Sequence, residues 1–448
     1  MSEYSQFIAN KSQLSGNYGF EPVFMPDKLF DFQKHLVEWA CRKGRSAIFA
    51  DCGLGKTFMQ LSWAQNVAQK TNGRVLILTP LAVSFQTVKE GEKIGVEVSH
   101  RREGIKESDK IVVTNYERMH YFSPHDFAGV VCDESSILKN FAGSTREAIT
   151  KFMSQVKYRM LCTATAAPND FMELGTSSEA LGYMKHREML SMYFSHDGGE
   201  PSKWTIKGHA AKGPFWSWMC SWSRAIRNPA DLGFSSHGFD LPELKIRRHI
   251  AYSNKAPDGF LFNLPAVGLD EQRDERRRTL KERCEMSADL IYAHKDSSVA
   301  WCHLNSEGDM LSSMIPGSVQ ISGSDSDERK EETFRAFESG QVRVIVTKPT
   351  IAGFGLNWQH CHHQTFFPSH SFEQWYQAIR RCWRFGQKNP VIVDVISSDG
   401  EADVVSNLER KAAAADLLFE QLVRHMNEQT TKETKQTTNT EMRIPSWL

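Results

Sequence analysis

The sequence predicts an α/β protein built from two consecutive parallel sheets. Short runs of aliphatic and β-branched residues recur along the chain, and amphipathic stretches of helix length separate them. Strands that are apolar throughout are typical of a parallel sheet whose two faces are covered by helices. The chain has 448 residues, of which 40% are hydrophobic, so it can form large packed cores.

The predicted strands fall into two series. The first series comprises SAIFA (46–50), RVLILTP (74–80), KIVVTN (110–115), GVVCDE (129–134) and RMLCTAT (159–165). The second begins near residue 298 and comprises SSVAWCHL, SVQISG, VRVIVTKP, QTFFPS and PVIVDVIS. Because helix-length stretches separate the strands of each series, we assign two α/β domains, to residues 29–175 and 296–400.

The remaining segments lack this rhythm. We assign residues 1–28 to an N-terminal extension, 176–245 to a Trp-rich insertion, 246–295 to a linker with a charged helix, 401–429 to a helix, and 430–448 to a disordered polar tail. The charged helix is expected to be solvated. The insertion combines tryptophans with cations, namely Trp204, Trp216, Trp218, Trp222, Lys203, Lys207, Lys212, Arg224 and Arg227. It could stack nucleic-acid bases, but such a cluster is more often the core of a subdomain.

Charge and cysteine content narrow the class of protein. The 54 basic and 54 acidic residues balance, which argues against a chain coated in positive charge but allows a local basic groove. The nine cysteines form no CxxC pair, so we expect reduced, buried thiols. No apolar run has transmembrane length and no signal-peptide core is seen, so we expect a cytoplasmic protein without a membrane partner.

The stretch ADCGLGKT (50–57) has the pattern of a phosphate-binding loop between a strand and a helix. Gly53 and Gly55 allow the backbone to approach phosphates. Lys56 can reach the terminal phosphates, and the hydroxyl of Thr57 can bind Mg²⁺.

A second element, VVCDESSILKN (130–140), ends a predicted strand in two adjacent carboxylates. Asp133 could bind Mg²⁺, and Glu134 could orient or deprotonate the attacking water, as hydrolysis of a γ-phosphate requires. Thr163 and Thr165 end another strand, and their hydroxyls could reach these carboxylates. Such contacts would couple the nucleotide state to a nucleic-acid groove.

The stretch QAIRRCWRFGQ (377–387) contains a cluster of arginines. On a helix, Arg381 and Arg384 would share one face while Arg380 points elsewhere. The pair could act as an arginine finger in cis, contributed by the second domain to a γ-phosphate held by the first. The alternative is a solvated basic helix.

The predicted second domain contains two further patterns. In TIAGFGLNWQ (350–359), Gly353 and Gly355 permit close approach to a ligand, and Asn357 can hydrogen-bond a phosphate or the neighbouring domain. The run HCHH (360–363) suggests a metal site. Its histidines are adjacent rather than at ligand spacing and have no CxxC partner, so the sequence argues against zinc.

Taken in order, these motifs resemble those of superfamily 2 helicase-type ATPases, nearest to the Swi/Snf-related branch of DNA translocases. LFDFQ (29–33) resembles the adenine-reading motif, with Gln33 as the matching glutamine. The other matches are ADCGLGKT, LILTPLAVSFQ (76–86), VVTNYERM (112–119), DESS (133–136), CTATAAPND (162–170), TIAGFGLNWQ and QAIRRCWRFGQ, which resemble motifs I, Ia, Ib, II, III, V and VI. The resemblance covers most of residues 29–400.

The resemblance implies two tandem RecA-like domains, with ATP and Mg²⁺ as cofactors and nucleic acid as partner, DNA being favoured over RNA. It implies phosphate-backbone contacts for Thr79, Thr114 and Asn115. It also implies that Ser135 couples hydrolysis to motif III, and that Gln377 of motif VI has a coupling role. Compact relatives occur in bacteriophages and mobile elements, so the expected cytoplasmic location is the host cytoplasm if the protein is phage-encoded.

The sequence therefore predicts an ATP-dependent translocase that moves along duplex DNA. One alternative is a strand-separating DNA or RNA helicase. Another is a nucleotide-gated module that binds or remodels a protein partner through the insertion or the C-terminal tail.

Overall fold

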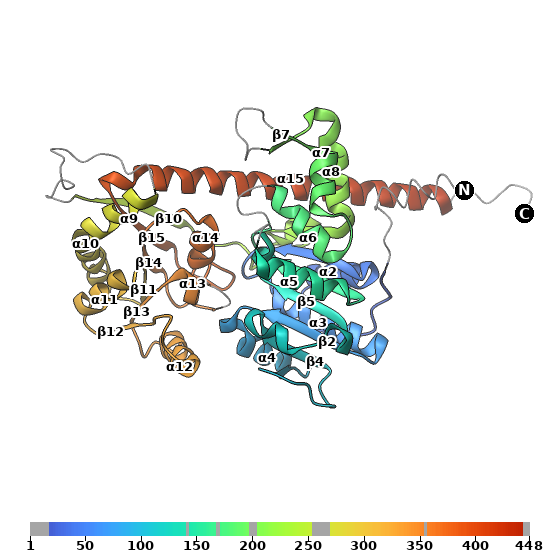
Figure 1. The fold of residues 1–448 in the computed structure, drawn as a ribbon, viewed down its shortest axis with the longest axis horizontal. Coiled ribbons are helices and arrows are strands. Elements are labelled where there is room, and N and C mark those ends of the chain that lie inside the picture. The colour runs from blue at the N-terminus through green and yellow to red at the C-terminus, as the bar shows by residue number, and fades with distance from the viewer. Residues whose placement is uncertain are drawn as a thin grey trace, which may run out of the picture. The chain divides into compact units, whose positions relative to one another are not determined.

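The computed structural model describes residues 18–139, 143–166, 171–196, 204–252, 269–353 and 356–441 (Figure 1). The chain divides into two compact units. Unit 1 comprises Met1–Ser236 with Ala415–Leu448, and unit 2 comprises His237–Ala414. None of the helices in the described ranges is long and apolar enough to span a membrane.

Unit 1 is built on a seven-stranded parallel sheet with the strand order β3-β4-β2-β5-β6-β1-β9. The strands are β1 (Arg45–Ala50), β2 (Arg74–Thr79), β3 (Ser99–His100), β4 (Ile111–Asn115), β5 (Phe127–Asp133), β6 (Tyr158–Thr163) and β9 (Ser223–Ile226). Five of these are the predicted first series. The central strands are buried almost throughout, as expected for a parallel sheet covered on both faces.

The described helices of unit 1 are α2 (Asp31–Lys43), α3 (Lys56–Thr71), α4 (Ser84–Lys93), α5 (Ser144–Ser154), α6 (Leu174–Leu181), α7 (His186–Tyr193), α8 (Gly208–Trp222) and the part of α15 (Ala402–Glu441) that follows Ala414. A short antiparallel hairpin joins β7 (Phe194–His196) to β8 (Trp204–Ile206). Short 3₁₀ helices include η2 (Tyr116–Tyr121) and η4 (Ser135–Lys139).

The Trp-rich segment contributes to the core of unit 1. Trp216, Trp218 and Trp222 are at most 3% exposed and belong to the same apolar cluster as Phe49 of β1. The segment also supplies β9, which pairs with β1 and extends the sheet at its edge. These three tryptophans are therefore core residues, which agrees with the alternative that such a cluster forms a core. Their rings are not available to stack on bases.

Unit 2 is built on a six-stranded parallel sheet with the order β10-β15-β14-β11-β13-β12. The strands are β10 (Leu244–Ala251), β11 (Ser298–Trp301), β12 (Ser318–Gln320), β13 (Val344–Thr347), β14 (His363–Phe366) and β15 (Val391–Ser398). The helices are α9 (Leu269–Arg278), α10 (Leu280–Ala293), α11 (Asn305–Met314), α12 (Asp327–Glu338), α13 (Pro349–Ala352), α14 (Phe372–Ile379) and the first part of α15 (Ala402–Glu441).

Three features of these elements differ from the sequence analysis. The one charged helix predicted within residues 246–295 is two helices, α9 and α10, separated at Thr279. The prediction that this charged segment is solvated is wrong in part, because Arg283 is buried and donates to Glu307 at 2.8 Å. The helix α15 continues to Glu441 and so includes residues assigned to the polar tail. Residues 442–448 lie outside the described ranges.

All nine cysteines are buried, and none forms a disulfide. Burial raises the pKa of several of these thiols, including Cys41 and Cys132, each to about 12. Both thiols are therefore protonated at neutral pH and are not poised as nucleophiles. The expectation of buried thiols is confirmed.

Candidate nucleotide-binding site

The phosphate-binding loop of unit 1 joins β1 to α3. β1 ends at Ala50 and α3 begins at Lys56. Gly53 and Gly55 have φ values of +90° and +75°, a region that residues with a Cβ rarely adopt. The glycine-containing loop therefore leads directly into the N-terminus of α3. Backbone N–H groups at such a helix N-terminus favour the binding of phosphate.

Lys56 folds back over this loop. Its Nζ donates to the carbonyl of Ala50 at 3.0 Å. Thr57, the next residue, is half-buried in the first turn of α3. The ammonium and the hydroxyl therefore both lie at the amino end of α3, where the sequence predicts phosphate and Mg²⁺ binding.

Gln33 ties the preceding helix to the loop. It is 2% exposed on α2, and its Nε2 donates to the carbonyl of Leu54 at 2.9 Å. Its Oε1 accepts from the backbone N–H of Phe30 at 2.9 Å. A Cβ added at Gly55 would collide with this amide group, which gives a second reason for glycine there. Adenine recognition by Gln33 remains a prediction.

The paired carboxylates end β5, in the same sheet. Asp133 is 5% exposed, and its Oδ1 accepts from Nε2 of Gln60 at 2.6 Å. Burial raises the pKa of Asp133 to about 6, and the adjacent charge of Glu134 adds to this effect. Lys56 and Gln60 oppose the rise without abolishing it. A cation beside Asp133 would stabilise its ionised form, so this carboxylate fits the predicted Mg²⁺, whereas Mg²⁺ binding by Thr57 stays a prediction.

Glu134 has an uncommon backbone conformation. Its φ of +50° is in the left-handed region, which is costly for a residue with a Cβ and is found most often at functional sites. Thr163, at the end of β6, donates from Oγ1 to Oε2 of Glu134 at 3.3 Å. The N–H of Thr165 in turn donates to Oγ1 of Thr163 at 3.1 Å. The structure thus contains the hydroxyl–carboxylate contact predicted for Thr163.

Among the residues predicted to have coupling roles, two in unit 1 and one in unit 2 each have a buried polar atom without a hydrogen-bond partner among the described residues. These atoms are Oγ of Ser135, Oγ1 of Thr165 and Oδ1 of Asn357. All three residues were predicted to have coupling roles, which no contact here tests. Residues 167–170, at the end of the third motif, and Gly355 lie outside the described ranges.

The residues predicted to contact nucleic acid lie at the carboxyl ends of the neighbouring strands β2 and β4. Thr79 and Thr114 are 0% exposed, and Asn115 is 5% exposed. Oγ1 of Thr79 shares a hydrogen bond of 2.9 Å with Oγ of Ser84. Asn115 caps η2 by accepting from the N–H of Arg118 at 3.1 Å. Their predicted contacts with a phosphate backbone remain untested.

In unit 2, the arginine cluster follows α14 rather than lying on it. The predicted helical placement is wrong, because α14 ends at Ile379 and the chain turns there. Arg381 and Arg384 nevertheless converge, since both donate from Nη1 to the carbonyl of Leu356, at 3.3 and 2.9 Å. Nη2 of Arg381 also donates to Oε1 of the buried Gln377 at 2.9 Å.

Arg380 has different surroundings. Its guanidinium lies 4.8 Å from the ring centroid of Trp383 and 5.7 Å from that of Tyr376. Arg381 and Arg384 thus form a pair, and Arg380 stands apart, as the sequence spacing predicts. The sequence analysis did not identify Leu356, whose backbone carbonyl accepts hydrogen bonds from both Arg381 and Arg384.

Two further side chains, which the sequence analysis did not identify, contact Asp133 at the end of β5. Gln60 lies four residues after Lys56 on α3, so the two side chains share a helix face. Tyr116 donates from its hydroxyl to the carbonyl of Asp133. The i, i+4 spacing from Lys56 could have identified Gln60, whereas Tyr116 had no comparable signal.

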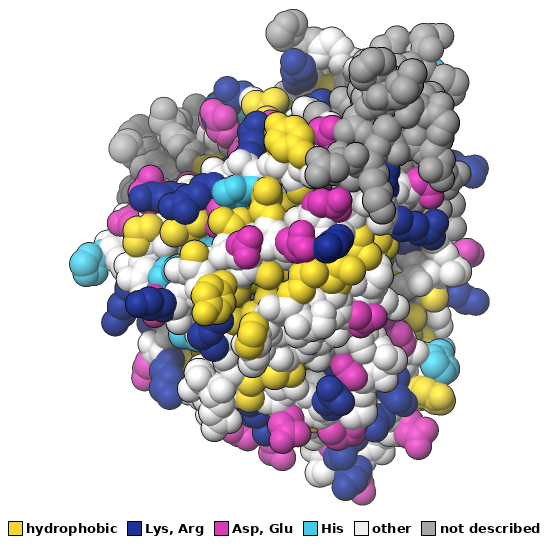
Figure 2. All heavy atoms as spheres, turned by 90° about the vertical axis from the view of Figure 1, so that its left-hand side faces the viewer, with side chains coloured by type: hydrophobic (Ala, Val, Ile, Leu, Met, Phe, Trp, Pro, Cys, Tyr) yellow, Lys and Arg dark blue, Asp and Glu magenta, His cyan; other side chains and the backbone are white. Residues whose placement is uncertain are grey.

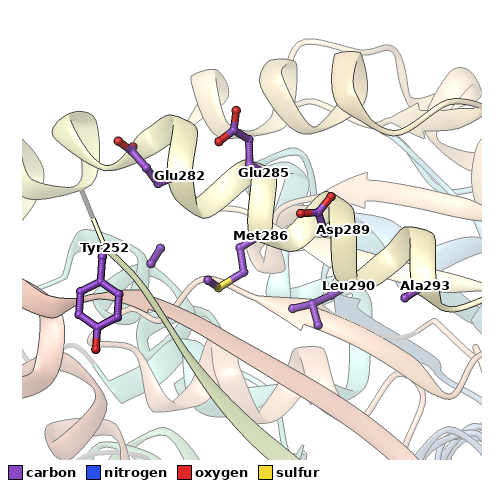
Figure 3. A pocket seen from close by; sticks show the side chains of 8 residues that line it. Tyr252, Glu282, Glu285, Met286, Asp289, Leu290 and Ala293 are labelled. Carbon is purple, nitrogen blue, oxygen red and sulfur yellow. The ribbon is translucent and has the colours of Figure 1, made fainter. Parts of the chain in front are cut away.

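A cavity of about 480 Å³ in unit 2 lies apart from these motifs, between α10 and the end of β10 (Figure 3). Figure 3 shows Met286 and Leu290 pointing from α10 toward the sheet, and Glu282 and Glu285 pointing away from it. The outer face of the molecule seen in Figure 2 has basic, acidic and apolar side chains interspersed. The chain continues from Tyr252 into residues 253–268, which lie outside the described ranges, so we assign no ligand to this cavity.

The two parallel sheets with their covering helices have the fold of two tandem RecA-like α/β domains. No protein-family model and no curated protein sequence matches the chain. Among solved structures, the chain resembles S. cerevisiae Dbp5 bound to RNA and ADP BeF3, with a TM-score of 0.55 and 11% identity over 90% of this chain and 94% of that one. It also matches the Sulfolobus solfataricus SWI2/SNF2 ATPase core in complex with dsDNA, with a TM-score of 0.42 and 18% identity over 92% and 97%.

Proposed function

We propose that this protein is a nucleic-acid-stimulated ATPase that uses ATP hydrolysis to move along duplex DNA. One observation carries the ATPase part of the proposal. The phosphate-binding loop and the Asp133–Glu134 pair stand at carboxyl ends of strands in one parallel sheet, and the hydrogen bond from Gln60 joins their elements. Ligands of parallel α/β sheets bind at this edge.

In the proposed site, the glycine backbone of the loop binds the phosphates. Lys56 interacts with the terminal phosphates, while Thr57 and Asp133 hold Mg²⁺, which neutralises phosphate charge when bound. Glu134 orients the attacking water and accepts its proton. The contact from Thr163 fixes the carboxylate that performs this step.

Arg381 and Arg384 complete the proposed mechanism as an arginine finger in cis. Their guanidinium groups would stabilise the charge that develops on the γ-phosphate in the transition state. Because they belong to unit 2, hydrolysis would require the two units to close on the nucleotide. Nucleic acid bound across both units would favour closure and so stimulate turnover.

The choice of duplex DNA as substrate rests on the resemblance of the motifs to Swi/Snf-related translocases. A strand-separating helicase acting on RNA is the second candidate, because the structurally similar Dbp5 is bound to RNA. A protein partner, a cytoplasmic location and a phage or mobile-element origin remain predictions.

The discriminating experiment measures ATPase rate without nucleic acid and with single-stranded DNA, duplex DNA or RNA. Strongest stimulation by duplex DNA, together with displacement of a triplex strand but not of a duplex strand, is expected. Stimulation only by RNA, with duplex unwinding, would favour the second candidate. A rate unaffected by any nucleic acid would instead favour a module that acts on a protein.

A further inference from the structure

Two loops at one edge of the unit 2 sheet bring His294, Asp296 and His362 together. His294 caps the carboxyl end of α10, Asp296 lies in the loop before β11, and His362 directly precedes β14. β11 and β14 are parallel neighbours in which Ser298 pairs with His363 (Figure 1). Both loops therefore lie at the amino edge of the sheet, opposite the edge where its motif residues follow β13.

The three side chains are close enough to share an ion. One ligand atom from each lies within 4.8 Å of the others. Nε2 of His362 is 3.6 Å from Oδ2 of Asp296, and the two imidazole rings of His294 and His362 have centroids 5.0 Å apart. Zinc bound at about 2.0–2.2 Å would hold neighbouring ligand atoms roughly 3.3 Å apart. A small closing movement suffices, and the side chain of Asp296, which is 68% exposed, is able to make it.

Unsatisfied nitrogen atoms point to a ligand rather than to an isolated ion pair. Nε2 of His294 and Nδ1 of His362 are buried and have no hydrogen-bond partner among the described residues. Such atoms are uncommon in folded proteins and call for a partner. A metal ion bound by His294 would provide one, because neutral imidazole nitrogen is a good ligand for zinc and related ions.

The residues around His294, Asp296 and His362 show which side chains are free to bind an ion. Both ring nitrogens of His363 are occupied, by Ser298 and Asp394 at 2.9 Å each, so His363 is not a candidate ligand. Arg343 donates to the backbone carbonyls of His294 and Asp296, at 3.0 and 3.5 Å, and orders the loop without using its side-chain ligands. The last carbonyls of α10 lie next to His294 and favour a cation there.

We propose that His294, Asp296 and His362 form a binding site for a divalent first-row transition-metal ion, with Zn²⁺ as the expected occupant. Two imidazoles and one carboxylate make a recognised ligand set for such ions, and water completes the coordination. The ion joins the loop after α10 to the segment before β14 and so stabilises this edge of unit 2. This site is independent of the proposed ATPase activity.

The proposal is tested by metal titration of the full chain after chelator treatment. Co²⁺ serves as the probe because its visible absorption reports ligand geometry, and excess Mg²⁺ is included to occupy oxygen-ligand sites. The wild-type protein should take up a single Co²⁺ that Zn²⁺ displaces. Its thermal midpoint should rise with metal concentration, as expected for a ligand that binds the folded state.

Asp296→Asn and His362→Ala should weaken binding by more than the ~10- to 100-fold that loss of a supporting residue costs. Asp296→Asn is nearly isosteric at an exposed position, so it is expected to fold even if His362→Ala does not. His360→Ala, in the same HCHH run, is the matched control and should bind as wild type does. Absence of Co²⁺ uptake by the wild type at micromolar metal, or equal uptake by Asp296→Asn and wild type, would overturn the proposal.

Discussion

Gln60 donates a hydrogen bond of 2.6 Å to the carboxylate of Asp133, and both side chains are buried. This contact links α3, which begins at the phosphate-binding loop, to the end of β5. It favours the ionised form of a carboxylate whose pKa burial raises to about 6. Gln60 is therefore a positioning residue for the proposed Mg²⁺ ligand.

Gln60→Leu should raise the pKa of Asp133 further, because it removes a donor that stabilises the charged form. If hydrolysis needs ionised Asp133, activity is lost as pH falls through this pKa. The acid limb of kcat/KM for ATP should then lie near pH 6 in the wild type and at higher pH in the variant. The profile is measured between about pH 5 and 9 at saturating nucleic acid, with MgATP as the substrate and without excess free Mg²⁺, so that kcat/KM reports Asp133 before the metal binds.

A second variant, Gln60→Glu, places another carboxylate beside Asp133. Like-charge repulsion should then raise the pKa of Asp133 and move the acid limb in the same direction. Unchanged profiles in both variants, with the fold intact, would show that Asp133 does not titrate in the activity.

Lys56→Ala should abolish ATP hydrolysis and leave the fold intact. Lys56 is half-buried and its ammonium donates to the carbonyl of Ala50, so its removal should affect the core little. Turnover and thermal midpoint are measured on the same preparation. Near-normal turnover would remove the assignment of this loop as the catalytic site.

Glu134→Gln should retain ATP and Mg²⁺ binding through Lys56 and Asp133 but stall hydrolysis, because an amide cannot accept the proton of water. Thr163 can still donate to the amide oxygen, so the local geometry should survive. Equilibrium binding of a fluorescent ATP analogue and single-turnover hydrolysis separate the two effects. Loss of binding in this variant would indicate a structural role for Glu134 instead.

The positions of most strands could be predicted because apolar runs of strand length are a local signal. β10 could not, since its sequence LKIRRHIA carries three basic residues before a histidine and lies at the sheet edge, where Ile246 and Ile250 remain 50% and 46% exposed. Its pairing with β15 is a long-range contact that no local pattern reveals. The sequence analysis also failed to place the end of α14 at Ile379, because it assumed that the helix continues through the arginine cluster.

The candidate sites likewise include residues that the sequence could predict and residues that it could not. Motif spacing predicted the loop around Lys56, the pair Asp133–Glu134 and the contact from Thr163, because each role depends on residue type at a strand end. Spacing alone argued against metal at HCHH, since the other two proposed ligands, His294 and Asp296, come from a distant loop. Only the pairing of β11 with β14 brings those residues together.

Arg384→Ala tests the proposed two-domain mechanism most directly. Arg384 belongs to unit 2 and the phosphate-binding loop to unit 1, so a catalytic role requires the units to close. An arginine finger contributes on the order of a thousandfold or more in rate. The variant should therefore lose hydrolysis while ATP binding, which depends on unit 1, changes little. Arg381→Ala should behave alike, because both side chains converge on Leu356.

Arg380→Ala is the matched comparison, and its expected defect is of another kind. Arg380 is 3% exposed and lies over the rings of Tyr376 and Trp383, so its loss should lower the thermal midpoint more than the turnover of the folded fraction. Stopped-flow ATP binding, steady-state turnover and melting are measured on all three variants. If the three substitutions have equal and small effects on turnover, the cluster stabilises unit 2 and the finger assignment is wrong. Loss of turnover in the folded fraction of Arg381→Ala and Arg384→Ala, at unchanged ATP affinity, is the result that the proposed mechanism requires.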